Sequence, residues 1–358
     1  MDTYSGDRGG GGVSEDSANF APTHPRQDLI ITMVEAATVQ NVNLAEQNIT
    51  FEQFVELVAP VFSFSQWISF DISGNMLGPR GGATMAGILT MASSLRELNL
   101  SHNQLGDEGV IEIFRVLPHT NLTRLELEGN YLTDRCVLEL ARTLNQSKVQ
   151  ELLMSYNHIT DQGLLALCPV IGNLKILDLF SNQLSDEGIT ALSQVIPACM
   201  TELYLGGNVR VGDGGIVALS RALAVSNVRI LGLMENSITD VGVNALTEAA
   251  KVSHLTEVLL NRNPWSCEAR ERLERVLLVC DSAMYKTLIV LCSVREITRL
   301  GVNSSFKAIP IELIRKIALA IYDPADIGGV SAELSENEED SDEGEDEGVG
   351  DVDDVVGA

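Results

Sequence analysis

Apolar and polar residues along this chain follow one nine-residue pattern that recurs at nearly constant spacing. Apolar residues take its first, fourth and sixth positions and asparagine takes the ninth, as in "LRELNLSHN" from Leu95 and "LKILDLFSN" from Leu174. Successive copies start 25 to 28 residues apart, which indicates a repeat architecture. We number these copies as repeats 1 to 9, starting at Val39, Trp67, Leu95, Leu122, Val149, Leu174, Met200, Val228 and Leu255.

Each repeat has two halves with different hydrophobic periods. The nine-residue pattern alternates apolar and polar residues with period two, which predicts a short strand. The stretch that follows it, such as "LSDEGITALSQVI" in repeat 6, changes to helical spacing. The chain is therefore predicted to consist of about nine strand–helix units.

Aspartate and glycine recur at the start of the predicted helices. An aspartate precedes six of the helical runs, at the place expected of an N-cap: Asp107, Asp134, Asp161, Asp186, Asp213 and Asp240. A glycine follows two residues later in five of them, where a bulky side chain would obstruct packing of the first turn: Gly109, Gly163, Gly188, Gly215 and Gly242. Cys136 takes this place in repeat 4.

A strand and a helix at this period, with asparagine at the ninth position, resemble the leucine-rich repeats of the ribonuclease-inhibitor-like class. The resemblance covers residues 39–280. It implies an α/β solenoid, or horseshoe, with an inner parallel sheet and outer helices. Family members bind partners through the exposed side chains of the inner sheet, at positions 5, 7 and 8 of the nine-residue pattern.

The asparagine column is expected to be structural. An asparagine amide carries both donors and acceptors, so it can satisfy the turn that leaves its own strand and the turn of the neighbouring repeat. Repeat 1 has Gln47 at this position. We call the other eight residues the asparagine ladder: Asn75, Asn103, Asn130, Asn157, Asn182, Asn208, Asn236 and Asn263.

Both ends of a solenoid need caps. Residues 25–38 are predicted to form an N-terminal capping helix, and Trp265 is predicted to close the last core layer. Residues 281–330 are predicted to form a helical module. It is either a cap or, because "IPIELIRKIALAIYD" within 309–327 resembles the opening of an F-box, an element that would bind a ubiquitin-ligase adaptor.

Charge and composition narrow the possible partners. The formal net charge of −26 argues against nucleic acid and anionic membranes as partners, because both are negatively charged. Residues 331–358 hold 13 Asp or Glu and no Lys or Arg, so this acidic tail is predicted to be disordered, like the polar, Gly-rich residues 1–24. Neither a signal-like apolar segment nor a membrane-length apolar run is visible, and we expect a monomer of the cytoplasm or nucleus.

No catalytic or metal-binding constellation is apparent. The five histidines are dispersed, the six cysteines lack ligand spacing, and no cofactor motif is present. The chain is therefore predicted not to be an enzyme. The repeats and the acidic tail also resemble Ran GTPase-activating proteins, which would make Arg80 in "NMLGPRGG" the residue offered to a small GTPase.

The predicted inner face changes character along the repeats. Repeats 1 to 4 present Asn43, Asp71, Asn99, Glu126 and Glu128. From repeat 5 onwards, positions 5, 7 and 8 carry large apolar side chains: Leu153, Tyr156, Phe180, Tyr204, Met234 and Leu259. These six are predicted to form one patch that binds another protein, bordered by charged residues. The alternative is that the C-terminal module or tail covers the patch within the same chain.

Overall fold

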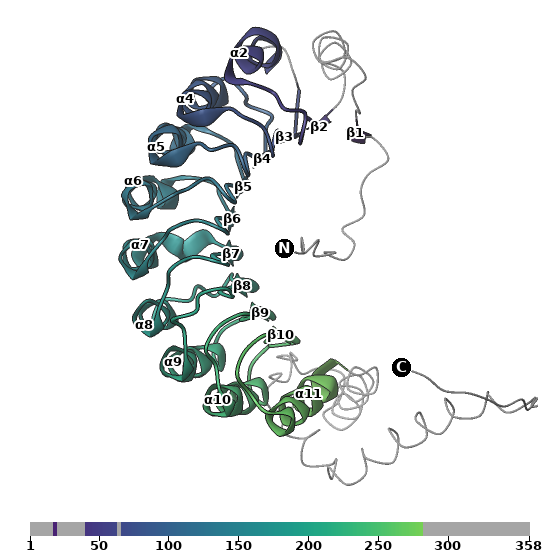
Figure 1. The fold of residues 1–358 in the computed structure, drawn as a ribbon, viewed down its shortest axis with the longest axis vertical. Coiled ribbons are helices and arrows are strands. Elements are labelled where there is room, and N and C mark those ends of the chain that lie inside the picture. The colour runs from purple at the N-terminus through teal and green to yellow at the C-terminus, as the bar shows by residue number, and fades with distance from the viewer. Residues whose placement is uncertain (1–16, 20–39, 63–65, 282–358) are drawn as a thin grey trace, which may run out of the picture. The chain divides into compact units, whose positions relative to one another are not determined.

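The computed structural model describes residues 17–19, 40–62 and 66–281. Over the described residues 40–281, strands and helices alternate and build a curved solenoid, with the strands on its inner side and the helices on its outer side (Figure 1). The predicted fold class, an α/β leucine-rich-repeat solenoid with an inner parallel sheet, is confirmed. Each of the nine repeats contributes its strand at positions 3 to 5 of the nine-residue pattern.

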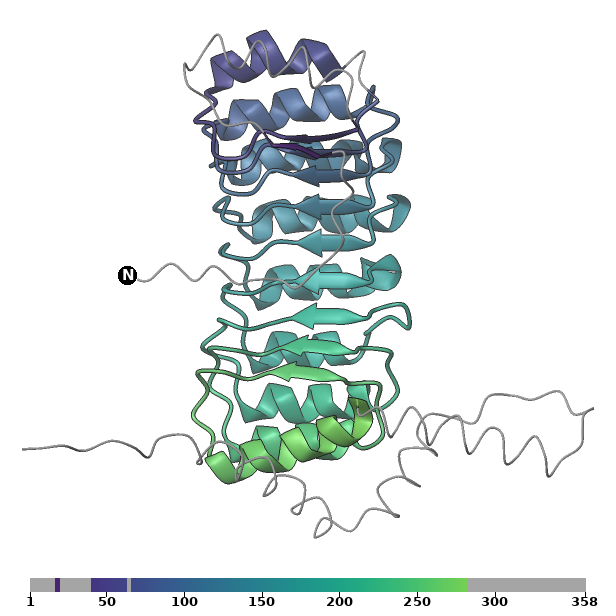
Figure 2. The ribbon, with the colours of Figure 1, turned by 90° about the vertical axis from the view of Figure 1, so that its right-hand side faces the viewer.

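The described part of the chain forms one parallel sheet whose strand order follows the sequence (Figure 2). Equivalent repeat positions pair across it, as Leu152 does with Leu177, because every repeat places its turn at the same point. The strands are β1 (Ser17–Asn19), β2 (Asn41–Asn43), β3 (Ser69–Asp71), β4 (Glu97–Asn99), β5 (Arg124–Glu126), β6 (Glu151–Leu153), β7 (Ile176–Asp178), β8 (Glu202–Tyr204), β9 (Ile230–Gly232) and β10 (Glu257–Leu259).

Helices and helical turns form the outer layer. After β2, the segments α2 (Phe51–Gln53), η1 (Phe54–Val58) and α3 (Ala59–Phe62) follow one another without a break. The later helices are α4 (Gly78–Leu89), α5 (Gly106–Val116), α6 (Asp134–Thr143), α7 (Asp161–Leu167), α8 (Asp186–Ser193), α9 (Asp213–Leu223), α10 (Asp240–Ala250) and α11 (Cys267–Asp281). Short 3-10 turns follow three of them, namely η2 (Leu117–His119), η3 (Leu144–Gln146) and η4 (Cys168–Asn173).

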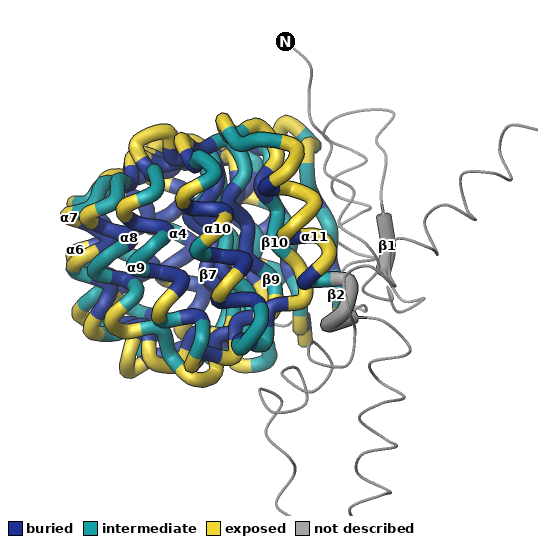
Figure 3. The backbone as a smooth tube through the Cα atoms, turned by 90° about the horizontal axis from the view of Figure 1, so that it is seen from below, coloured by how far each residue is buried: buried dark blue, intermediate teal, exposed yellow. Residues whose placement is uncertain are grey.

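The core lies between the two layers (Figure 3). Positions 1, 4 and 6 of the pattern are buried wherever the structure describes them, apart from the partly buried Val258 in β10. Val39, at position 1 of repeat 1, lies outside the described residues. Trp265 is partly buried and packs against this core after the last strand, as predicted. Burial of aliphatic side chains at about 25 cal/mol per Å² is the main force that holds the repeats together.

Strand β1 extends the sheet beside β2, with Ser17 opposite Asn41. The sequence pattern gives no sign of this strand, which lies within the stretch 1–24 predicted to be disordered. The predicted capping helix at 25–38, the truncated F-box at 309–327 and the acidic tail at 331–358 lie outside the described residues. So does the module at 281–330, apart from Asp281 at the end of α11.

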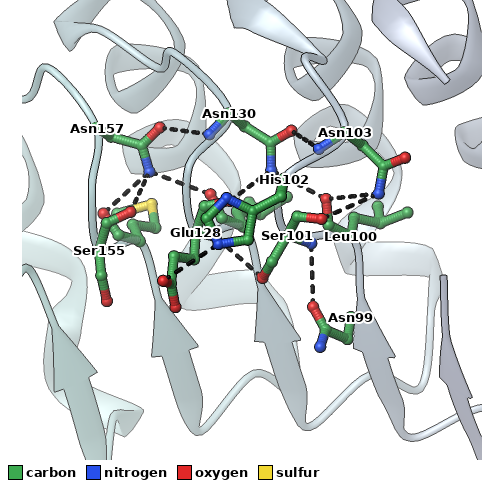
Figure 4. A network of polar contacts seen from close by, with 11 residues as sticks. Asn99, Leu100, Ser101, His102, Asn103, Glu128, Asn130, Ser155 and Asn157 are labelled. Carbon is green, nitrogen blue, oxygen red and sulfur yellow. Dashed lines mark hydrogen bonds and ion pairs between the residues drawn. The ribbon is translucent and has the colours of Figure 1, made fainter. Parts of the chain in front are cut away.

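The asparagine ladder makes the double connection expected of it (Figure 4). The side-chain amide of Asn157 donates to the carbonyls of Leu127, Met154 and Ser155 at 2.9–3.1 Å. Its Oδ1 accepts from backbone amides of the preceding repeat. The Oδ1 atoms of the other ladder residues do the same, with the exception of Asn103. The buried Oδ1 of Asn103 has no hydrogen-bond partner among the described residues. These hydrogen bonds join the turn of each repeat to the turn of the preceding one.

The prediction that the repeated aspartates are N-caps is wrong. Helices α6, α7 and α10 begin at the aspartate, and the preceding threonine is the N-cap, because its hydroxyl accepts from the backbone. The aspartate instead accepts from the N-cap residue of the next repeat. Asp134 Oδ1 lies 2.8 Å from the amide of Thr160, and its Oδ2 lies 2.6 Å from the hydroxyl. We call this series the aspartate ladder; it comprises Asp107, Asp134, Asp161, Asp186, Asp213 and Asp240.

The aspartate ladder also explains the glycines that follow the aspartates. A Cβ added to Gly188 would lie 2.3 Å from Oδ1 of Asp161 in the preceding repeat, and one on Gly242 would lie 2.7 Å from Oδ1 of Asp213. The glycines therefore leave room for the carboxylates. The obstruction predicted from the sequence is real. The obstructed group is the aspartate of the preceding repeat at four of the glycines, whereas a Cβ on Gly109 would meet the backbone of Pro79.

Acid is expected to weaken the last link of the aspartate ladder. The amide and the hydroxyl of Ser266 donate to Asp240 and hold the pKa of its carboxyl below the ordinary value. A depressed folded-state pKa gives stability that is present above the unfolded pKa of about 3.9 and is lost as the pH falls through the folded-state value.

We therefore expect the urea midpoint of unfolding to fall less in Asp240→Asn than in the wild type when the pH is lowered from about 6 to about 3. Glu257→Gln, which removes an exposed carboxylate from β10, is the control and should keep the wild-type pH response. An equal loss in Asp240→Asn and the wild type would contradict the expectation.

Candidate functional site

The candidate site lies on the inner face of the sheet, between β6 and β10. Five of the six predicted apolar residues reach its surface, and they come from five consecutive repeats. We call these five the apolar patch: Tyr156, Phe180, Tyr204, Met234 and Leu259. Tyr156 is 51% exposed, and the other four are half-buried.

Leu153 does not belong to the exposed patch, which corrects the sequence prediction. It is only 4% exposed. Its register neighbours are Glu126 on β5 and Asp178 on β7, so it sits in the middle of the sheet. Side chains on the inner face of a curved sheet converge, and a central leucine is therefore crowded by its neighbours. Asp178, at 1% exposure, also separates Leu153 from Tyr204.

An aromatic pair links the exposed Tyr156 to the half-buried Phe180 within the patch. The ring centroids of Tyr156 and Phe180 lie 5.3 Å apart, with the planes tilted by 59°. This spacing is within the range in which aromatic side chains attract one another. The backbone supports the pair, because the amide of Tyr156 donates to the carbonyl of Phe180 at 2.8 Å.

Tyr156 occupies a backbone position that suits glycine better. Position 8 has a left-handed φ between 53° and 69° in all nine repeats. Glycine takes that position in three of them, at Gly74, Gly129 and Gly207. A side chain in the left-handed region costs about 1–2 kcal/mol. The chain therefore accepts backbone strain where it presents the Tyr156 ring (φ 53°).

Two glycines that the sequence analysis did not single out shape the patch. A Cβ on Gly206 would lie 2.9 Å from Cδ2 of Phe180, and a Cβ on Gly232 would lie 2.6 Å from Cδ1 of Tyr204. Each ring therefore lies across a glycine of the next repeat. The signal was available in the sequence, because each glycine stands in an inner-face position directly after a repeat with an aromatic residue.

Carboxylates surround the apolar patch. The hydroxyl of Tyr204 donates to Glu202 at 2.9 Å, and Arg262 pairs with Glu235 at 2.6 Å. Arg124 lies between two carboxylates, 2.7 Å from Glu126 and 2.5 Å from Glu151. Burial lowers the pKa of the Arg124 guanidinium, and these two carboxylates outweigh it, so the pKa is raised overall.

The environment of Tyr156 disfavours a negative charge. Partial burial raises the pKa of its hydroxyl, and the carboxylates of Glu128, Glu235 and Asp178 raise it further. These carboxylates come from three different repeats and act on the same ring. Negative charge from three repeats therefore acts on the Tyr156 hydroxyl.

The polar residues of the early repeats have a local role. The Oδ1 atoms of Asn43, Asp71 and Asn99 accept from the amide two residues further on, at 2.8, 2.9 and 3.0 Å. Asp178 makes the same contact with the amide of Phe180 at 2.9 Å. These position 5 side chains therefore stabilise the turn that leaves each strand, as Asx turns do.

Arg80 lies apart from the patch. It belongs to the first turn of α4, in the outer layer of repeat 2, and its guanidinium carbon is 4.2 Å from the centre of the Phe51 ring. This contact is a cation–π interaction with a neighbouring helix. The small-GTPase hypothesis for Arg80 stays a prediction.

Metal and membrane features were also sought within the described residues. There, no group of three or more His, Cys, Asp or Glu side chains could hold a metal ion. In the same residues, Cys136, Cys168, Cys199 and Cys267 are free thiols. Burial raises the pKa of the Cys136 thiol, and the neighbouring Asp107 adds to this. No helix of the described chain is long and apolar enough to cross a membrane.

The strand–helix repeats and their repeated asparagine have the architecture of leucine-rich repeats. The leucine-rich-repeat family model matches residues 92–114, 145–168, 173–193 and 197–220, so these segments are leucine-rich repeats, as the sequence resemblance predicts. Assignment to the ribonuclease-inhibitor-like class stays a prediction. No curated protein matches the sequence.

Two solved structures are similar at low identity. An internalin (inlF) from Listeria monocytogenes str. 4b F2365 shares 18% identity with a TM-score of 0.46, over 68% of this chain and 60% of that one. A chain of the yeast Rad7 and Elc1 complex shares 17% identity with a TM-score of 0.44, over 64% of this chain and 65% of that one. This chain thus spans less than two thirds of either, and neither similarity says what it binds.

Proposed function

We propose that this chain is a non-catalytic scaffold that binds a partner protein through the apolar patch on its inner face. Leucine-rich repeats provide the frame for such a surface, and the patch provides aromatic anchors with a charged rim. Tyrosine and other aromatic side chains dominate the binding energy of many protein interfaces.

Tyr156 is the observation that carries this proposal. Its ring is 51% exposed, lies against Phe180 and stands on a residue with a left-handed backbone. A glycine would satisfy the same turn without strain. Stability alone therefore does not account for a large exposed aromatic side chain at this position, whereas contact with a partner does.

Replacing both rings of the pair with carboxylates tests the proposal. We expect Tyr156→Asp with Phe180→Asp to weaken partner capture by a factor of at least about 30, because one anchor residue contributes about 2 kcal/mol. Leu138→Asp with Leu165→Asp is the matched control. It places the same charges on two leucines that are 45% and 43% exposed on the outer helices α6 and α7.

The measurement is affinity purification with quantitative mass spectrometry of the wild type and both double variants. Urea denaturation should show that both variants remain folded. Proteins lost from the inner-face variant and kept by the outer-face variant would support the proposal. Equal recovery from all three forms would reject it.

A cross-linker at the patch separates an external partner from a cover formed by the same chain. A photo-reactive benzoylphenylalanine replaces Phe180 in one form and Leu165 in the other. We expect links to another protein from position 180 and not from position 165. Links from position 180 that stay within the chain would reject an external partner.

A further inference from the structure

Charge on the inner face of repeats 4 to 8 is strongly one-sided. Positions 3, 5, 7 and 8 of these repeats carry six carboxylates and one cation. The carboxylates are Glu126, Glu128, Glu151, Asp178, Glu202 and Glu235, and the cation is Arg124. Since Arg124 is held between Glu126 and Glu151, its charge is already matched within the chain. A net of five negative charges remains on this face.

Two of these carboxylates flank Tyr156 along the repeats, and both raise the pKa of its hydroxyl. Glu128 lies in the repeat before Tyr156, and Glu235 lies three repeats after it. Their ion pairs, with His102 at 3.3 Å and with Arg262 at 2.6 Å, are solvent-exposed. Exposed ion pairs contribute little, about 0–1 kcal/mol, so they leave both carboxylates available to a stronger cationic partner.

The aromatic pair itself suits a cation. The face of a tyrosine or phenylalanine ring attracts an ammonium or guanidinium group within about 6 Å of its centroid. Tyr156 and Phe180 present two tilted rings 5.3 Å apart, and the carboxylates of Glu128, Glu235 and Asp178 act on the Tyr156 hydroxyl. Next to this pair, Tyr204, Met234 and Leu259 offer an apolar surface for an uncharged neighbour.

We infer, on the basis of the proposed function, that the patch recognises a partner segment carrying a Lys or Arg side chain beside an apolar one. The cation lies over the Tyr156–Phe180 pair, within the field of the Glu128 and Glu235 carboxylates. The apolar side chain packs on Tyr204, Met234 and Leu259. The occupant is therefore a basic protein segment.

Charge also argues against a cover formed by the ends of this chain. Residues 331–358 hold 13 Asp or Glu and no Lys or Arg, and like charges repel across an interface. Residues 1–16 hold four Asp or Glu and one Arg. Residues 282–330, with six Lys or Arg and four Asp or Glu, are nearly balanced. A basic segment of another protein complements the inner face better than any of these.

A library of random 12-residue peptides displayed on phage tests the inference without knowledge of the partner. Selections run in parallel on the full chain and on its Tyr156→Ala, Phe180→Ala variant, whose folding is checked by urea denaturation. We expect the peptides that depend on the two rings to be enriched in Lys or Arg next to an apolar residue. Their affinity should fall as salt rises from about 50 to about 500 mM, because screening weakens exposed charge pairs.

Neutralising the two carboxylates tests the charge itself. With a synthetic peptide from the selection, we expect Glu128→Gln with Glu235→Gln to lower affinity about three- to tenfold. Glu108→Gln with Glu187→Gln, which removes two exposed carboxylates from the outer helices, should leave the affinity unchanged.

The outcomes separate this inference from the proposed function. Peptides that depend on Tyr156 and Phe180 but lack basic residues would overturn the inference and leave the proposed function intact. A cross-link from position 180 into residues 282–330 would show that a segment of this chain, and not an external partner, occupies the patch. That result would overturn the inference. Failure to select any peptide that depends on the two rings would count against both.

Discussion

Replacing Asn157 with alanine is expected to lower the free energy of unfolding by about 3 kcal/mol. The side chain is only 4% exposed and makes five hydrogen bonds. It donates to three carbonyls and accepts from the amides of Asn130 and Leu132, at 3.1 and 2.9 Å. Alanine leaves three of these backbone groups without a partner, namely the carbonyl of Leu127 and the amides of Asn130 and Leu132. The carbonyls of Met154 and Ser155 still accept from the side chain of Asn182 and the amide of Gly129. Each buried unsatisfied group costs about 1–3 kcal/mol, and partial relaxation limits the sum.

Urea denaturation followed by circular dichroism measures this loss. Asn145→Ala is the matched control, because Asn145 is exposed in η3, the turn just before the same nine-residue pattern. Its free energy of unfolding should stay within about 0.5 kcal/mol of the wild type. A similar loss in both variants would mean that the asparagine ladder has no special structural role.

Two glycine-to-alanine changes in α4 are expected to have opposite effects. A Cβ on Gly82 would lie 2.6–2.8 Å from three backbone atoms of Gly109 in α5. Backbone atoms cannot rotate away, so α4 and α5 would have to separate. Overpacking of this kind costs about 1–3 kcal/mol, and we expect Gly82→Ala to lie at the upper end.

Gly87→Ala is the control within the same helix. Nothing lies within 4 Å of a Cβ at this exposed position. Alanine there restricts the unfolded chain and favours the helix, so stability should rise by about 0.5–1 kcal/mol. Thermal denaturation of both variants checks the difference in sign. A loss in both would mean that α4 tolerates no change of backbone freedom, and a gain in both would contradict the close approach of α4 and α5.

The inner face shows how far the repeat pattern can locate a site. Positions 5, 7 and 8 were predicted to carry the surface residues, and five of the six chosen residues do reach the surface. Leu153 does not, because side chains converge on the inner face of a curved sheet. The pattern gives the direction of a side chain, whereas its exposure depends on neighbours about 25 residues away.

The aspartates of the helical half show a different limit. Their place before a helical run matched an N-cap, whereas in α6, α7, α8 and α10 the true N-cap is the threonine or serine one residue earlier. Sequence spacing could not show that Asp134 reaches the hydroxyl of Thr160 in the next repeat. This contact exists only because the repeats stack in register.

The sequence by itself determined the repeat, its strand and helix halves, the buried apolar columns and the asparagine ladder. These features follow from local periodicity and from the polar groups that every turn must satisfy, and both can be read along the chain. Only the tertiary structure decided that the rings of Tyr156 and Phe180 meet and that Leu153 is covered. These features depend on distances between neighbouring repeats, which are set by the curvature and register of the stacked sheet.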